Sequence, residues 1–126
     1  MKTNLIKISM YRISKEFEFC ASHQLRHLEE GHPCMRVHGH NYKVIVTFEA
    51  KELNKDGFII DYRKLEPIKR LLDNAFDHKH LNDFLPFQPS AENIAKHIYD
   101  LCKEQFPELV SVTVKETDKT AATYEE

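Results

Sequence analysis

The chain has 126 residues, of which 41% are hydrophobic and 30% charged, with a formal net charge of -2 at pH 7. We expect residues 1–126 to form one globular domain with a sizeable core. No apolar run approaches the roughly 18 residues of a membrane span, and neither a secretory signal nor a basic stripe with aromatics is visible. These absences predict a cytoplasmic protein that binds neither membrane nor nucleic acid.

Two segments in the first half of the chain have the period of β-strands. In residues 13–23 the apolar side chains alternate with polar ones, and His23 falls on the same face as Phe17 and Phe19. Residues 40–50 alternate in the same way, with His40 and Tyr42 on the apolar face. A loop that contains glycine and proline separates the two segments, so we expect two neighbouring strands.

The second half of the chain begins with two helical patterns. Apolar residues between 68 and 76 repeat at helical spacing, and Asp61 is a plausible N-cap for this segment. Pro67 then marks either a later start or a kink. A second helix is predicted from the cap Ser90 to Pro107, which stops it.

Residues 109–117 alternate again, and residues 120–126 can form a short final strand. The predicted order is therefore strand, strand, helix, helix, strand, strand (ββααββ). This order is typical of an α+β fold, in which a four-stranded antiparallel sheet carries two helices on one face.

Three histidines are placed by the strand period at one end of this sheet. His38 and His40 are two residues apart and point the same way, while His23 ends the preceding strand. If the two strands pair, the three imidazoles converge. Three neutral nitrogens with an open position are typical of a catalytic metal site, and zinc suits imidazole. The alternative is that these are ordinary surface or core histidines, as we expect for His27, His32, His80 and His97.

The cysteines are three in number and irregularly spaced, which does not indicate a disulfide framework. Cys34, four residues before His38, allows two interpretations. It is either a fourth metal ligand that closes a structural site, or a base whose thiolate is favoured by a nearby cation. Spacing does not decide between them. Cys20 and Cys102 are expected to be packing residues.

Asp77 and His78 follow the first predicted helix and form a second group of interest. His78 can act as a proton shuttle, or it can simply place a cationic group at a helix end. Neighbouring residues of a helix do not face each other, so Asp77 need not orient His78.

Glu116 continues the apolar face formed by Val110, Val112 and Val114. A buried carboxylate is costly unless it is paired, so Glu116 is a candidate ligand-binding group that accepts two hydrogen bonds. The alternative is that the strand has already left the sheet at this residue.

Six segments together resemble the 6-pyruvoyl-tetrahydropterin synthase and 6-carboxytetrahydropterin synthase family. They are "FEFCASH", "CMRVHGH", "DYRKL", "FDHKHLN", "PSAENIAKHIYD" and "VKETDKTAATY", and the resemblance runs from about residue 12 to residue 124. The interval from Cys34 to the His-Gly-His triplet resembles the carboxytetrahydropterin branch. One departure is Gln24, where the family commonly has an arginine. If that arginine assists phosphate binding, another basic residue such as Arg26, Arg36 or Lys115 must replace it.

The resemblance implies a role for each candidate residue. A Zn²⁺ ion would be held by His23, His38 and His40. Cys34 would be the proton acceptor, and His78 and Glu116, supported by Asp77, would complete a proton relay. Glu116 would also bind the amino-pyrimidine edge of a pterin.

The resemblance also implies the tunnelling fold, with trimeric barrels that pair into hexamers and active sites between subunits. The implied enzyme is a lyase of queuosine biosynthesis. It would convert 7,8-dihydroneopterin triphosphate to 6-carboxy-5,6,7,8-tetrahydropterin, releasing acetaldehyde and triphosphate. The alternatives are formation of 6-pyruvoyl-tetrahydropterin from the same substrate and a non-catalytic zinc- or pterin-binding module.

Overall fold

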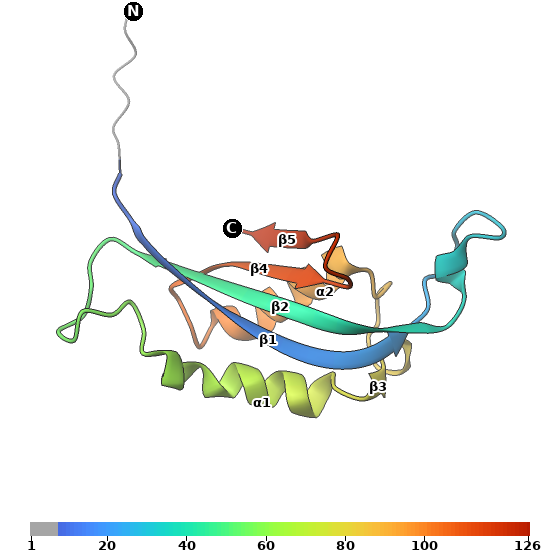
Figure 1. Ribbon diagram of the computed structural model, residues 1–126, viewed down its shortest axis with the longest axis horizontal. Coiled ribbons are helices and arrows are strands. Elements are labelled where there is room, and N and C mark those ends of the chain that lie inside the picture. The colour runs from blue at the N-terminus through green and yellow to red at the C-terminus, as the bar shows by residue number, and fades with distance from the viewer. Residues whose placement is uncertain (1–7) are drawn as a thin grey trace, which may run out of the picture.

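The computed structural model describes residues 8–126, so residues 1–7 of the expected domain lie outside the described part. It contains five strands and two α-helices (Figure 1). In chain order these are β1 (Tyr11–His23), β2 (His38–Ala50), α1 (Glu66–Ala75), β3 (Lys79–His80), α2 (Ala91–Lys103), β4 (Leu109–Lys115) and β5 (Ala122–Glu125). The predicted α+β class is confirmed.

The sheet has the strand order β3-β1-β2-β4-β5, so the expectation of four strands is wrong by one. The extra strand, β3, is two residues long and runs parallel to β1, whereas all the other pairs are antiparallel. A strand of two residues has no period that sequence analysis can detect. β3 forms only because the chain after α1 returns along the outer edge of β1.

β1 and β2 form a long antiparallel pair, visible in Figure 1 as two curved ribbons side by side. Their register is unbroken from Tyr11 opposite Ala50 to His23 opposite His38. Phe19 lies opposite Tyr42 on the buried face, and the two rings stack with centroids 4.7 Å apart. Alternation of apolar and polar residues in both strands specifies this register.

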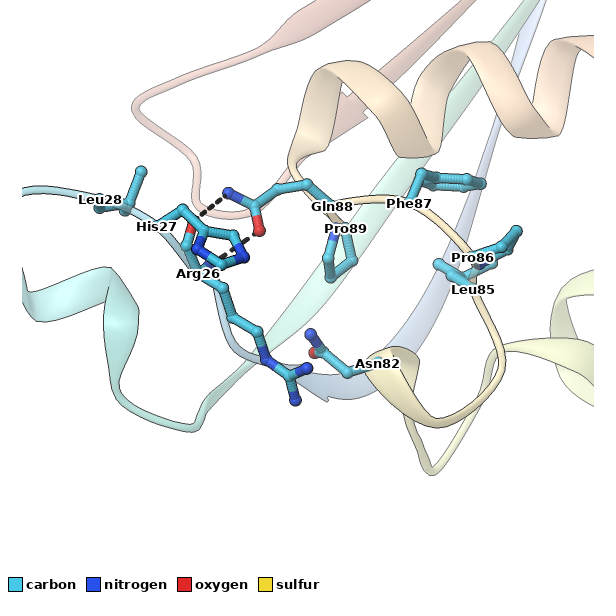
Figure 2. Close-up of a pocket in the computed structure, with 9 residues that line it drawn as sticks. All are labelled: Arg26, His27, Leu28, Asn82, Leu85, Pro86, Phe87, Gln88 and Pro89. Carbon is cyan, nitrogen blue, oxygen red and sulfur yellow. Dashed lines mark hydrogen bonds between the residues drawn. The ribbon is translucent and has the colours of Figure 1, made fainter.

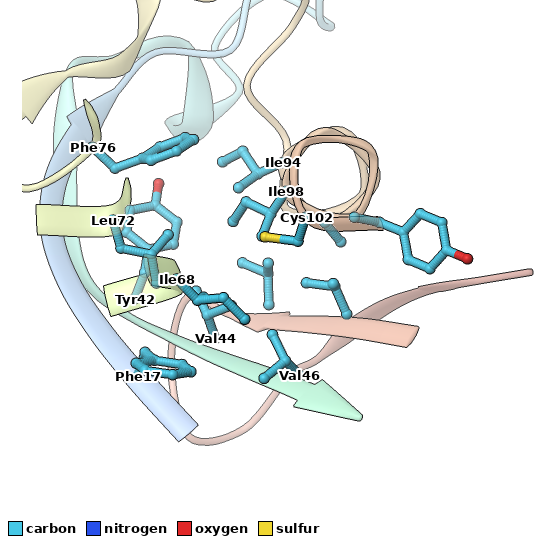
Figure 3. Close-up of a cluster of buried hydrophobic side chains, with 14 of the residues drawn as sticks. Phe17, Tyr42, Val44, Val46, Ile68, Leu72, Phe76, Ile94, Ile98 and Cys102 are labelled. Atoms are coloured by element: carbon cyan, nitrogen blue, oxygen red, sulfur yellow. The ribbon is translucent and has the colours of Figure 1, made fainter. Parts of the chain in front are cut away.

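Both helices pack against one face of the sheet and share its core (Figure 3). Pro67 marks a later start of α1, not a kink, because it occupies the first turn, where its missing N–H costs nothing. Asp61 caps a short 3-10 turn at Tyr62–Leu65, and this turn leads into α1. Ser90 caps α2 as expected, its hydroxyl accepting a hydrogen bond from the Asn93 N–H.

Two expectations about packing were wrong. Val110 is only half-buried, because the register of β4 against β2 shifts between Thr47 and Phe48 and a bulge turns Val110 out of the buried row. Cys20 is exposed, since it has the opposite parity to Phe19 and points away from the helices. Cys102 is buried in the core as expected, and burial raises its pKa to about 11.

Within residues 8–126, no helix combines the length and apolarity needed to cross a membrane.

Two positions on α2 test this packing. Ile98 is fully buried between α2 and the sheet, whereas Leu101, on the same helix, is 46% exposed. We expect Ile98→Ala to lower the free energy of unfolding by about 2–5 kcal/mol, because it leaves a cavity in the core. Leu101→Ala should change it by no more than about 0.5 kcal/mol. Urea unfolding followed by circular dichroism at one protein concentration measures both, and equal effects would contradict this core.

A candidate metal centre

Three histidines meet where β1 ends and β2 begins. The β1–β2 register sets His23 opposite His38, and His40 lies two residues further along the same face of β2. One ring nitrogen from each of the three lies within 4.8 Å of the others. The convergence expected from strand parity is therefore present in the structure.

Two backbone carbonyls determine which ring nitrogens face the centre. The Pro89 carbonyl oxygen lies 2.7 Å from Nδ1 of His23, and the Arg36 carbonyl oxygen lies 2.7 Å from Nδ1 of His38. A carbonyl only accepts hydrogen bonds, so each Nδ1 carries the proton. Each neutral ring then presents the lone pair of Nε2, which is the arrangement that metal-binding histidines normally have.

The Nε2 atoms converge, and those of His23 and His38 are both acceptors. Nε2 of His23 lies 2.9 Å from Nε2 of His38, too close for two lone pairs unless a cation or proton lies between them. Nε2 of His40 is buried and has no hydrogen-bond partner in the described chain. A buried polar nitrogen without a partner is costly. The three residues therefore fit a divalent cation bound through Nε2.

Burial favours the neutral, metal-binding form of these rings. His23 is fully buried, and desolvation lowers the pKa of both His23 and His40 despite the opposing effect of Glu116. The cluster borders the aromatic core, because the Tyr42 ring lies edge-on to His23 and His40, with centroids 5.8 and 5.3 Å away. Metal binding needs deprotonated imidazole, so this environment suits it.

Glu116 adds a carboxylate to the centre. It comes directly after the last residue of β4, and its Oε2 lies 3.3 Å from Nε2 of His23 and 3.6 Å from Nε2 of His40. Its side chain is 26% exposed, so it is neither buried nor free of the sheet. At this position the carboxylate can contribute to binding a cation or accept hydrogen bonds from a ligand. Sequence analysis did not connect Glu116 with the histidines.

Cys34 lies apart from the cluster. It is half-buried in a 3-10 turn at Pro33–Met35, where its carbonyl accepts a hydrogen bond from the Leu25 N–H. In the described chain, the group of ligand atoms that lie within 4.8 Å of one another contains the three histidines and not Cys34. This arrangement favours the interpretation of Cys34 as a base over that of a fourth ligand.

Asp77 and His78 form a hydrogen-bonded pair, although neighbouring residues of a helix would not face each other. Nδ1 of His78 lies 2.7 Å from Oδ2 of Asp77. Both residues follow the end of α1 at Ala75, and His78 has a φ of 58°. This left-handed conformation turns the imidazole toward Asp77, which a helical backbone would not do.

The Asp77–His78 pair is fixed to the outer edge of β1. The Cys20 N–H donates to Oδ1 of Asp77 at 2.8 Å, and the His78 N–H donates to the Cys20 carbonyl. The hydrogen bond from the Cys20 N–H is the main reason that the pKa of Asp77 is lowered, followed by the contact with His78. The His78 side chain is 81% exposed, and β2, which carries His38 and His40, lies on the other side of β1.

Pro89 is a functional residue that sequence analysis missed. Its carbonyl orients His23 from a loop 66 positions along the chain. No local pattern marks a backbone carbonyl as a histidine partner. The one local indication is that Pro89 directly precedes the helix cap Ser90, a position where the backbone is held in a defined conformation.

A small α+β fold that gathers three neutral imidazoles at the end of a strand pair defines a candidate three-histidine metalloprotein. Comparison with known families is more specific, because the model of the family described as 6-pyruvoyl tetrahydropterin synthase matches residues 12–126. The chain belongs to this family.

Relatives and solved structures agree with the family match. A 6-carboxy-5,6,7,8-tetrahydropterin synthase of Synechocystis is 38% identical, over 91% of this chain and 93% of the relative. A protein of the same name from Bacillus subtilis is 32% identical, over 90% and 84%. The fold matches the structure of Caenorhabditis elegans 6-pyruvoyl tetrahydropterin synthase with a TM-score of 0.82 at 24% identity, over 97% of this chain and 99% of that chain.

The cluster leads to a prediction about metal content. We expect one divalent ion per chain in the purified protein, and His38→Ala should weaken metal binding by at least about 100-fold, since even partners outside the ligand set contribute 10–100-fold. His97→Ala, which removes an imidazole on α2 outside the cluster, should leave metal content unchanged. Elemental analysis after dialysis, with a competing chelator for affinity, tests this. Full metal content in His38→Ala would contradict the assignment.

Proposed function

We propose that this protein is a zinc-dependent lyase that makes 6-carboxy-5,6,7,8-tetrahydropterin from 7,8-dihydroneopterin triphosphate and water, with release of acetaldehyde and triphosphate. This reaction belongs to queuosine biosynthesis. The observation that carries the proposal is the convergence of the three Nε2 atoms in a chain of this family. The names of the two relatives at 38% and 32% identity support the product.

Zn²⁺ fits the three imidazoles better than Mg²⁺ or Ca²⁺, which prefer oxygen ligands. When bound, it would polarise and acidify hydroxyl groups on the substrate side chain. His23, His38 and His40 would hold it through Nε2. Pro89 and Arg36, through their carbonyls, would keep the first two of these rings in the correct tautomer.

Cys34 and the Asp77–His78 pair are the proposed proton-transfer groups. Cys34 would accept a carbon-bound proton from the substrate side chain. Asp77 holds Nδ1 of His78 at 2.7 Å, which leaves Nε2 of His78 free to take up or deliver a proton. This division resembles the way a carboxylate orients the imidazole of other acid–base pairs.

The position of the Asp77–His78 pair supports a homo-oligomer. The pair lies on the outer edge of β1, beyond its own metal centre, and the imidazole of His78 is largely exposed. We propose that association of subunits into trimers or hexamers brings the pair of one subunit to the centre of another.

Glu116 is the proposed group that binds the pterin. A carboxylate beside the histidines can accept two hydrogen bonds from an amino-pyrimidine edge, which would set the side chain of the pterin against the metal. The same carboxylate would contribute to the proton relay.

Product analysis tests the proposed reaction. The zinc-loaded protein should convert 7,8-dihydroneopterin triphosphate to equal amounts of 6-carboxytetrahydropterin and acetaldehyde, measured by chromatography and by a coupled alcohol dehydrogenase assay. Loss of triphosphate without acetaldehyde would instead assign 6-pyruvoyl-tetrahydropterin formation. No turnover with zinc bound would indicate a non-catalytic module.

The role of Cys34 gives a separate prediction. We expect Cys34→Ala to retain its zinc and to lose about 10²–10⁴-fold in kcat, which is the usual contribution of a general base. Cys20→Ala is the matched control, because Asp77 and His78 contact only the backbone of Cys20. Its turnover should stay close to that of the unmodified protein. Loss of zinc from Cys34→Ala would make Cys34 a ligand and overturn this role.

A further inference from the structure

A cavity of about 520 Å³ lies beside the candidate metal centre, between the chain that follows β1 and the loop that precedes α2 (Figure 2). Its polar lining consists of Arg26, His27, Asn82 and Gln88, and its apolar lining comes from Leu28 and from residues 85–87 and 89. No carboxylate lines it. Its volume is in the range of small-molecule sites, and its charged groups are basic.

Two side-chain amides fix the backbone on the Arg26 side of the cavity. Asn82 accepts from the Gln24 N–H and donates to the Gln24 carbonyl, both at 2.8 Å. Gln88 makes the same pair of bonds, also at 2.8 Å, with the backbone of Arg26, drawn as dashed lines in Figure 2. Four hydrogen bonds therefore hold the backbone of the chain immediately after His23, where no described strand pairs with it.

The guanidinium of Arg26 is available for a ligand. The Arg26 side chain is exposed and has no hydrogen bond or ion pair with any residue in the described part of the chain. The next residue, His27, has a left-handed backbone conformation with a φ of 63°. Arg26 and His27 both line the cavity. A non-glycine residue in this left-handed conformation is unfavourable and often occurs at functional sites. A fixed backbone beneath an unpaired guanidinium is well suited to binding an anion.

The cavity and the metal centre share a wall. Pro89 lines the cavity, and its carbonyl also holds Nδ1 of His23, whose Nε2 faces the centre. One imidazole ring therefore connects the cavity wall to the histidine cluster. The cavity therefore adjoins the histidine cluster on the Pro89 side of His23.

We propose that this cavity binds the triphosphate group of the substrate, with Arg26 as the principal contact and His27 as a second one. The inference rests on the proposed function, which supplies a substrate with a polyanionic tail. Arginine pairs with phosphate oxygens through two parallel N–H bonds. The amide of Gln88 holds the backbone of Arg26, and the amide of Asn82 holds that of Gln24 two residues earlier. Arg36 and Lys115, the other basic candidates, do not line this cavity.

Kinetics with matched arginine variants test the proposal. We expect Arg26→Ala to raise KM for 7,8-dihydroneopterin triphosphate by about 10–100-fold while kcat changes by less than about 3-fold, as for a lost charge-assisted contact outside the reacting centre. Arg26→Lys should recover only part of the loss, because lysine lacks the planar fork. Arg70→Ala removes an exposed arginine on α1 outside the cavity and should leave KM unchanged. Thermal unfolding of each variant confirms that it is folded.

A binding measurement separates this inference from the proposed function. Inorganic triphosphate, supplied as its magnesium complex, is titrated into the zinc-loaded protein by calorimetry, and zinc content is checked afterwards. Weaker binding by about 10-fold or more in Arg26→Ala, but not in Arg70→Ala, supports an anion site even if the protein turns over no pterin. If the unmodified protein is active but Arg26→Ala matches Arg70→Ala in KM and in triphosphate binding, the proposed function stands and this inference is wrong.

Discussion

The register of β1 against β2 is the constraint on which the rest of the molecule depends. Because side chains alternate along a strand, a slip of one residue would move His38 and His40 to the opposite face of the sheet from His23. The same slip would expose Tyr42 and Val44, which are fully buried in the observed register. Burial of this apolar face therefore stabilises the register that brings the three imidazoles together.

Without a bound cation, the histidine cluster is electrostatically unfavourable. The acceptor nitrogens of His23 and His38, the unpartnered Nε2 of His40 and the carboxylate of Glu116 face one another at the edge of an aromatic core. A bound cation would convert this repulsion into attraction, so metal binding and local stability should be coupled. The fixed tautomers of His23 and His38 also favour cation binding. Pro89 and Arg36 hold the protons on the far sides of two rings, which leaves the near sides available to the ion.

The long pair of strands also separates two kinds of chemistry. The end of β1 and the start of β2 carry the histidines of the candidate metal centre, whereas the outer edge of β1 carries the Asp77–His78 pair through two backbone hydrogen bonds at Cys20. Beyond the end of β1, side-chain amides extend the order of the strand over Gln24 and Arg26 without a partner strand. One structural element therefore positions the metal centre, the exposed acid–base pair and the basic cavity relative to one another.

The sequence by itself determined the α+β class, the long strands, the two helices and the convergence of His23, His38 and His40. All of these follow from periods of 2 and 3.6 residues, which are local properties of the chain. Only the tertiary structure decided the contacts that loops and chain ends make. It formed β3, turned Val110 out of the buried row, set Glu116 beside the histidines and joined Asp77 to His78. Most of these features depend on one backbone reaching another tens of residues away, and the Asp77–His78 contact depends on the left-handed backbone of His78. No local period records either.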